Sequence, residues 1–193
     1  AMTPNLLIDT LCERYKELKN VEIIQIHTHG EAKYTQAPYT ETFKLSSCFV
    51  GDNVRKGVNS ISGDYIPVFL SEIHWLFRRN ILPLDVAFIQ VSPPDKHGYC
   101  SLGVSVDVTL PAIQTAKKVV AQINPQVPRT HGDGIIHIKN IDFPFYDTSN
   151  SNNVFNSMSL INLNSIKDFE KKINEEVEYQ RFRANFYVDG IDV

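Results

Sequence analysis

The sequence predicts a three-layer α/β/α fold built on a mostly parallel β-sheet. Short apolar runs recur along the chain, and segments whose apolar residues have helical spacing separate them. The runs are apolar throughout instead of alternating with polar residues, which is typical of parallel strands covered on both faces. With 193 residues, 42% of them hydrophobic, the chain is long enough for one domain with a sizeable core.

The first expected helix follows Thr3 and Pro4. Apolar residues recur there every three or four positions, at Leu6, Leu7, Leu11, Tyr15 and Leu18. Thr3 is a suitable capping residue, and Pro4 fits a first helical turn. Two apolar runs come next, VEIIQIH over 21–27 and LSSCFVG over 45–51, and both are expected to be buried strands.

The middle of the chain continues the alternation of strands and helices. The expected elements are a helix over 52–61, a strand over 65–69, a helix over 71–80, strands over 86–91 and 104–108, a helix over 110–118 and a strand over 119–124. Pro93 and Pro94 end the strand over 86–91, because proline has no N–H to donate to a ladder.

Composition and charge exclude several classes of function. A net charge of -3 and an isoelectric point near 6.1 give no electrostatic basis for binding nucleic acid or anionic membranes. No apolar run approaches the roughly 18 residues that span a bilayer. The three cysteines, Cys12, Cys48 and Cys100, form no CxxC pair. They predict neither a zinc site nor a disulfide, and they suggest a reducing compartment: the cytoplasm, or the mitochondrion if the organism is eukaryotic.

Common catalytic and phosphate-binding motifs are absent from the sequence. The glycines follow neither GxGxxG nor GxxxxGK spacing, and no GxSxG elbow occurs. His27 and His29 form an HxH pair without an evident third ligand, so hydrogen-bonded histidines are expected there and no metal site. Nothing near Cys100 marks it as a low-pKa nucleophile.

Candidate binding residues lie just past the ends of expected strands. Gln90 and Ser92 precede the SPPD turn at the carboxyl edge of the sheet, where α/β folds build their binding crevices. Together with the loop over 98–103, they are expected to shape a binding pocket. The alternative is that SPPD is simply a stiff surface turn.

Asn53 and Arg55 follow another expected strand and are also candidates for substrate binding. The planar donor fork of Arg55 matches the geometry of a substrate carboxylate. The alternative is a structural ion pair between Arg55 and Asp64 or Glu72.

Three segments together resemble a known family over residues 1–142. They are GDNVRKGVNSISGDYIPVFLSEIHWLFRRN, LPLDVAFIQVSPPDKHGYCSLGVSVD and AKKVVAQINPQVPRTHGDG. They resemble the amino-terminal half of the acetyl-CoA hydrolase / 4-hydroxybutyrate CoA-transferase family. The resemblance implies acyl-CoA, with its coenzyme A body, and small carboxylic acids as substrates. It also implies a strand ahead of Thr3.

In that family, a glutamate of the other half attacks the acyl-CoA. The resemblance therefore implies that this chain holds no catalytic residue, needs a second domain and has almost no activity alone. An unpaired sheet edge and an apolar face should make the chain self-associate, or dock on a complete CoA-transferase subunit.

The tail over 143–193 is expected to be a short α+β segment. It contains DTS at 147–149, a helix start at Ser159 and RFRANFYVDG at 181–190. This pattern resembles part of the MOSC family, named for the carboxy-terminal domain of molybdenum-cofactor sulfurase.

In MOSC relatives that bind the molybdenum cofactor, the residues matching Thr148, Ser149 and Arg183 contact its pterin phosphate. The ligating cysteine would fall beyond Val193, so no cofactor or metal is expected on this chain alone. The alternative is a surface strand in which Arg181 and Arg183 lie near an acidic run.

Three hypotheses remain. The first is the first domain of an acetyl-CoA hydrolase or acyl-CoA:carboxylate CoA-transferase. The second is a non-catalytic assembly module that docks on a full CoA-transferase. The third is a truncated molybdenum-cofactor protein. The sequence does not distinguish hydrolase from transferase, and it does not identify the acyl group.

Overall fold

The chain forms two compact units, Ala1–Ser151 and Asn152–Val193. The computed structural model describes residues 2–147, 160–162, 170–171 and 186–188. In the second unit, β9 (Leu160–Asn162) pairs in parallel with β10 (Phe186–Val188). The candidate site lies entirely in the first unit.

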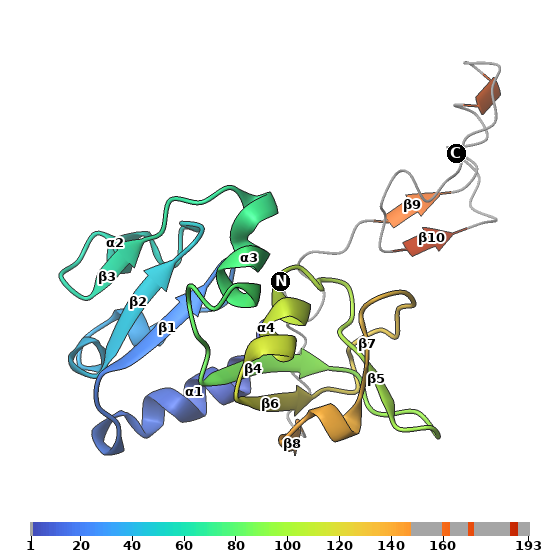
Figure 1. Ribbon diagram of the computed structural model, residues 1–193, viewed down its shortest axis with the longest axis horizontal. Helices are drawn as coiled ribbons and strands as arrows, with labels where there is room; N and C mark the ends of the chain where they lie inside the picture. The colour runs from blue at the N-terminus through green and yellow to red at the C-terminus, as the bar shows by residue number, and fades with distance from the viewer. Residues whose placement is uncertain (1, 148–159, 163–169, 172–185, 189–193) are drawn as a thin grey trace. The chain divides into compact units, whose positions relative to one another are not determined.

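The first unit contains two parallel three-stranded sheets (Figure 1). One has the order β1-β2-β3 and consists of β1 (Val21–Gln25), β2 (Phe43–Ser47) and β3 (Gly63–Tyr65). The other has the order β4-β6-β8 and consists of β4 (Val86–Val91), β6 (Lys118–Ile123) and β8 (Phe143–Tyr146). A small antiparallel pair, β5 (Tyr99–Ser101) with β7 (Ile135–His137), follows the end of β4.

Helices cover both faces of these sheets. On β1, Ile23 packs in a cluster with Ile8 of α1 (Asn5–Glu13), whereas Ile24 packs with Ile73 and Phe77 of α3 (Ile73–Arg78). Adjacent residues of a strand point to opposite faces, so α1 and α3 lie on opposite sides of the sheet.

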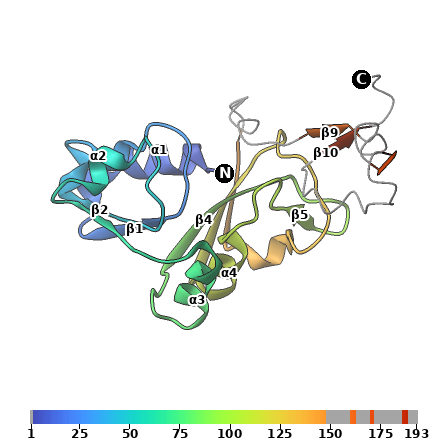
Figure 2. The ribbon, with the colours of Figure 1, turned by 90° about the horizontal axis from the view of Figure 1, so that it is seen from above.

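The second sheet is covered in the same way. Ala87, Ile89 and Val91 of β4 pack with Ala112 and Ile113 of α4 (Thr109–Thr115). Figure 2 shows α3 and α4 together, apart from α1. The predicted three-layer fold is therefore confirmed.

Several element bounds differ from those expected. The strand expected over 65–69 lies two residues earlier, as β3 over 63–65. Pro67 falls outside this strand and takes no part in its ladder. No strand forms over 104–108, because Gly103 and Asp107 have φ angles of +72° and +44°, which interrupt an extended run. The helix expected over 52–61 is reduced to the single turn of α2 (Arg55–Val58).

The end of the first unit lies beyond the boundary expected after Asp142. Residues 143–146 form β8, which pairs in parallel with β6. Asp147 then donates its backbone N–H to Ile123 O. The start of the segment assigned to the tail is thus an edge strand of the first unit.

Within the part of the chain that the structure describes, no helix combines the length and the apolar character needed to cross a membrane.

Because Ile123 of β6 lies in the buried core, its truncation should strongly lower the stability of the protein. Its side chain is fully buried between β4 and α4, so Ile123→Ala should lower the free energy of unfolding by about 2–5 kcal/mol. The matched control is Ile61→Ala, because Ile61 is fully exposed, and its effect should stay within about 0.5 kcal/mol. Urea denaturation measures both, and equal effects would contradict this assignment of the core.

Candidate functional site

A buried polar network lies at the carboxyl ends of β4, β6 and β8. We call it the Gln122 network, and its members are Gln90, Gln122, Asn124 and Asp147. Gln122 Nε2 donates to Gln90 Oε1 at 3.1 Å and to Asp147 Oδ2 at 2.7 Å. Asn124 Nδ2 donates to Gln90 Oε1 at 3.0 Å. The hydrogen bonds compensate for the loss of water around these buried groups.

The same network holds the start of α1. Gln122 Oε1 accepts from the backbone N–H of Leu6 at 3.2 Å, and Gln90 Nε2 donates to Thr3 O at 3.2 Å. The expected cap at Thr3 is wrong: α1 has Pro4 at its N-cap and no side-chain cap. The Thr3 hydroxyl instead accepts from the backbone N–H of His29, beyond β1, at 2.9 Å.

Gln90 and Ser92 are therefore engaged within the protein. Ser92 is 3% exposed, and its Oγ accepts from the backbone N–H of Ser101 at 2.8 Å. The backbone N–H of Ser92 also donates to Ser101 O at 2.9 Å. Ser92 thus fastens the end of β4 to β5, and Gln90 fastens it to β6.

The SPPD segment is a stiffened turn. Asp95 Oδ1 accepts from the backbone N–H groups of His97 and Tyr99, each at 2.9 Å, and Asp95 Oδ2 forms an ion pair with Arg129 at 2.7 Å. The Tyr99 N–H in particular holds the pKa of Asp95 below its usual range. On the strand that follows, β5, Cys100 is fully buried, and burial raises its pKa, so the thiolate is disfavoured.

Asn53 and Arg55 lie near the end of the other sheet. Asn53 Nδ2 donates to Thr28 O at 3.0 Å and to Gly30 O at 3.1 Å, so Asn53 fixes the loop after β1. Arg55 pairs with Asp52 at 2.9 Å instead of with Asp64 or Glu72.

The ion pair leaves the Arg55 side chain 63% exposed. A guanidinium has five N–H donors, so this pair does not exhaust its capacity to bind an anion.

The HxH pair packs as two rings in contact. The ring centroids of His27 and His29 lie 4.9 Å apart at 88°, and Phe49 contacts His27. Burial lowers the pKa of His29, and within the described residues its Nε2 has no hydrogen-bond partner. Those residues include no group of three side chains able to hold a metal ion.

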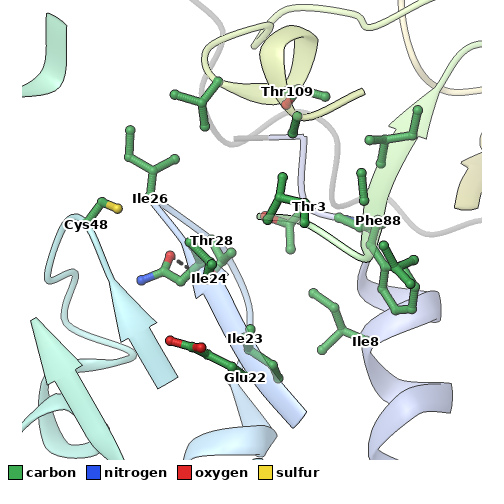
Figure 3. Close-up of a pocket in the computed structure, with 18 of the residues that line it drawn as sticks. Thr3, Ile8, Glu22, Ile23, Ile24, Ile26, Thr28, Cys48, Phe88 and Thr109 are labelled. Carbon is green, nitrogen blue, oxygen red and sulfur yellow. Dashed lines mark hydrogen bonds between the residues drawn. The ribbon is translucent and has the colours of Figure 1, made fainter. Parts of the chain in front are cut away.

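A cavity of about 740 Å³ separates β1 from β4. Figure 3 shows Ile23 and Ile24 of β1 on one wall and Phe88 of β4 on the other, with Ile8 of α1 nearby. Thr3 and Thr109 also line it. Neither Gln90 nor Ser92 lines this cavity, so the apolar space is not the binding pocket expected from the sequence.

Sequence reasoning missed Gln122, Asn124 and Asp147. A signal was present: Gln90 and Gln122 each interrupt an otherwise apolar strand, and the two are paired in register on β4 and β6. Two matching polar positions in buried parallel strands indicate a shared hydrogen-bond network. Thr148, Ser149 and Arg183, expected to contact a pterin phosphate, lie outside the described residues.

The Gln122 network predicts a loss of stability on substitution. Gln122→Leu takes a donor from Asp147 and an acceptor from Leu6, so the free energy of unfolding should fall by about 1–3 kcal/mol. The matched control is Gln114→Leu, because Gln114 is exposed and accepts a hydrogen bond from the surface residue Arg78 at 3.3 Å. Chemical denaturation compares the two variants. A Gln122→Leu protein as stable as the control would show that the network contributes nothing.

Comparison with known proteins gives matches over the first unit. The family model for the acetyl-CoA hydrolase/transferase N-terminal domain matches residues 1–155. The chain is 50% identical over 143 residues to a succinyl-CoA:acetate/propanoyl-CoA:succinate CoA transferase of Fasciola hepatica. This match covers 73% of this chain and 30% of that protein. It is 43% identical over 137 residues to a 4-hydroxybutyrate coenzyme A transferase of Clostridium kluyveri. That match covers 71% of this chain and 32% of the relative. The chain thus spans about a third of the length of these relatives.

Solved structures share the fold. RipA from Yersinia pestis matches with a TM-score of 0.70 and 23% identity, over 76% of this chain and 36% of RipA. A 4-hydroxybutyrate CoA-transferase from Porphyromonas gingivalis matches with a TM-score of 0.50 and 27% identity, over 72% of this chain and 38% of the transferase. With its family model covering most of the sequence, the chain belongs to the acetyl-CoA hydrolase/transferase family and carries that family's N-terminal domain.

Proposed function

We propose that this chain acts as the first domain of an acyl-CoA:carboxylate CoA-transferase or acetyl-CoA hydrolase. The observation that carries the proposal is the match of residues 1–155 to the N-terminal domain of that family. The two relatives described above are named as CoA transferases that act on small acyl groups. Acyl-CoA and small carboxylic acids are therefore the substrate class that we assign.

The chemistry requires a nucleophilic carboxylate, and the buried carboxylate among the described residues is engaged within the protein. Among them, the buried acid is Asp147, and its Oδ2 already accepts from Gln122 at 2.7 Å. A carboxylate held by such donors is a poor nucleophile, because attack on a thioester would break the hydrogen bond. We assign the nucleophile to the family's other domain and a substrate-positioning role to this one.

Arg55 is the residue of this domain that we assign to the substrate carboxylate. Its guanidinium is exposed near the carboxyl edge of the first sheet, and carboxylates bind guanidinium groups through two parallel hydrogen bonds. Asn53 supports the site indirectly, because its side chain fixes the loop after β1, whereas Gln90 and Ser92 fix the end of β4.

A second candidate, an assembly module that docks on a CoA-transferase subunit, has support from exposed apolar side chains. They lie at or beyond the ends of β2 and β3 and are Phe49, Tyr65, Phe69 and Leu70, each more than half exposed. Such a patch favours self-association or docking. Solution scattering of the purified chain tests this candidate, and a monodisperse monomer at high concentration would count against it.

The proposed function predicts opposite results for the isolated chain and for a chimera. The 193-residue chain alone should produce no CoA transfer from acetyl-CoA to succinate, because we assign the nucleophile to the family's other domain. A chimera in which the 143 matched residues replace their counterpart in the Fasciola hepatica enzyme should retain transfer activity. A thiol assay measures release and transfer of CoA. Turnover by the chain alone, or a folded but inactive chimera, would contradict the proposal.

In the same chimera, Arg55→Ala should raise the KM for the carboxylate about tenfold, because a charge-assisted hydrogen bond contributes about 1.5–3 kcal/mol. The KM for acyl-CoA should change little. The control is Lys56→Ala, since Lys56 is an exposed neighbouring cation on the same helical turn. Equal effects of the two substitutions would show a general loss of positive charge instead of a specific contact.

A further inference from the structure

We propose that His27 and Asn53 select the substrate acid by binding a hydroxyl group in the space beside Gly51, at the carboxyl edge of the first sheet. The inference rests on the proposed function, because it extends the carboxylate site that we assign to Arg55. These residues make the domain prefer a short hydroxy acid to an alkanoic acid of the same length.

The loops that follow β1 and β2 form one fixed surface at this edge. The two strands are parallel neighbours, so they end on the same side of the sheet (Figure 1). Asn53 in the second loop donates from Nδ2 to Thr28 O and Gly30 O in the first. From the end of β1, Gln25 Nε2 donates to Phe49 O at 3.2 Å. The side chains on the two loops are therefore held at defined positions relative to one another.

The orientation of the Asn53 amide is determined by its hydrogen bonds. Both contacts of Nδ2 are with carbonyl oxygens, so exchanging the nitrogen and the oxygen would lose both. Oδ1 consequently lies toward Gly51, and a Cβ atom built on Gly51 would be 3.1 Å from it. Within the described part of the chain, Oδ1 accepts no hydrogen bond, so it presents a free acceptor there.

The His27 ring faces the same point from the first loop. Its Nδ1 would lie 3.8 Å from the Cβ built on Gly51. Ring contacts with His29 and Phe49, at centroid distances of 4.9 Å and 5.5 Å, hold the imidazole in place. His27 is exposed, and among the described residues neither of its ring nitrogens has a hydrogen-bond partner. With its proton on Nδ1, the imidazole offers a donor beside the free acceptor of Asn53.

The lack of a side chain at Gly51 keeps these two polar atoms accessible. The φ angle of Gly51 lies outside the positive range that disfavours side chains, so backbone conformation does not demand glycine there. Apart from the chain neighbours of Gly51, the three atoms nearest its Cβ position are Asn53 Oδ1 and two atoms of the His27 ring. A side chain at this position would press on Asn53 Oδ1 and cover both residues.

A hydroxyl group matches this pair of atoms better than a carboxylate or an alkyl end. A hydroxyl both donates and accepts, so it can donate to Asn53 Oδ1 and accept from His27 Nδ1–H. An ionised carboxylate only accepts, and the exposed carboxylate of Asp52 next to Gly51 would repel it. An alkyl end would displace water and leave both polar atoms unpaired.

The proposed carboxylate site lies on the same turn. Val54 N donates to Gly51 O at 3.3 Å, which closes a turn over residues 51–54 directly before Arg55. Asp52, which follows Gly51, holds the Arg55 guanidinium at 2.9 Å. Phe49 is 52% exposed at this edge and provides apolar surface for methylene groups. A short acid bound by its carboxylate at Arg55 can therefore place a hydroxyl beside Gly51.

Binding to the full 193-residue chain, followed by NMR, tests the inference without requiring activity. The probes are 3-hydroxypropionate and 4-hydroxybutyrate, each compared with the alkanoate of equal carbon number, propionate or butyrate. At least one hydroxy acid should bind about tenfold more tightly than its alkanoate, because two ordinary hydrogen bonds together supply about that factor. The signals that shift should be the His27 ring and the Gly51 amide. Equal affinities within both pairs would overturn the inference.

A matched pair of histidine variants assigns the preference to its residue. His27→Leu should abolish the preference for the hydroxy acid, whereas His131→Leu should preserve it, because His131 is an exposed histidine elsewhere on the first unit. Gly51→Ala, which fills the space beside Asn53 Oδ1, should also abolish it. Dispersion of the amide signals shows whether each variant folds, and Gly51→Ala decides if His27→Leu does not. A preference that survives in the folded variants would contradict the assignment.

Two further measurements separate this inference from its alternatives. Arg55→Ala should weaken the hydroxy acid and the alkanoate by about the same factor, so their ratio should not change. Pantetheine carries a hydroxyl without a carboxylate, and binding to the His27 ring as tight as that of the hydroxy acid would assign the space to coenzyme A and overturn the assignment to the acid. An active chimera without hydroxyl preference would contradict this inference alone, whereas an inactive chimera with a hydroxyl-selective domain would contradict the proposed function alone.

Discussion

The first unit depends on the hydrogen bonds made by residues 3–6, which tie α1 to both sheets. Thr3 accepts from Gln90 and from the backbone of His29, and Leu6 donates to Gln122. No strand pairing joins the two sheets among the described residues. These few bonds, with the packing of helices on both faces, therefore set the distance between β1 and β4.

This constraint explains why polar side chains occur inside apolar strands. Gln90 and Gln122 are each at most 5% exposed, and they hydrogen bond to each other, to Asp147 and to the start of α1. A network of this kind is stable only when every member is satisfied. The candidate polar residues at the sheet edge therefore mostly hold the structure, and Arg55 is the one that faces solvent.

The sequence by itself determined the three-layer fold and the positions of β1, β4 and β6, because each of these strands is a local apolar run bounded by polar residues or proline. It also placed Gln90, Ser92, Asn53 and Arg55 near strand ends. Only the tertiary structure decided what those side chains contact. The partner of Arg55 is Asp52, and the shared partner of Gln90 and Asp147 is Gln122, 32 and 25 residues away along the chain. Local periodicity carries no information on which distant residues come to lie side by side.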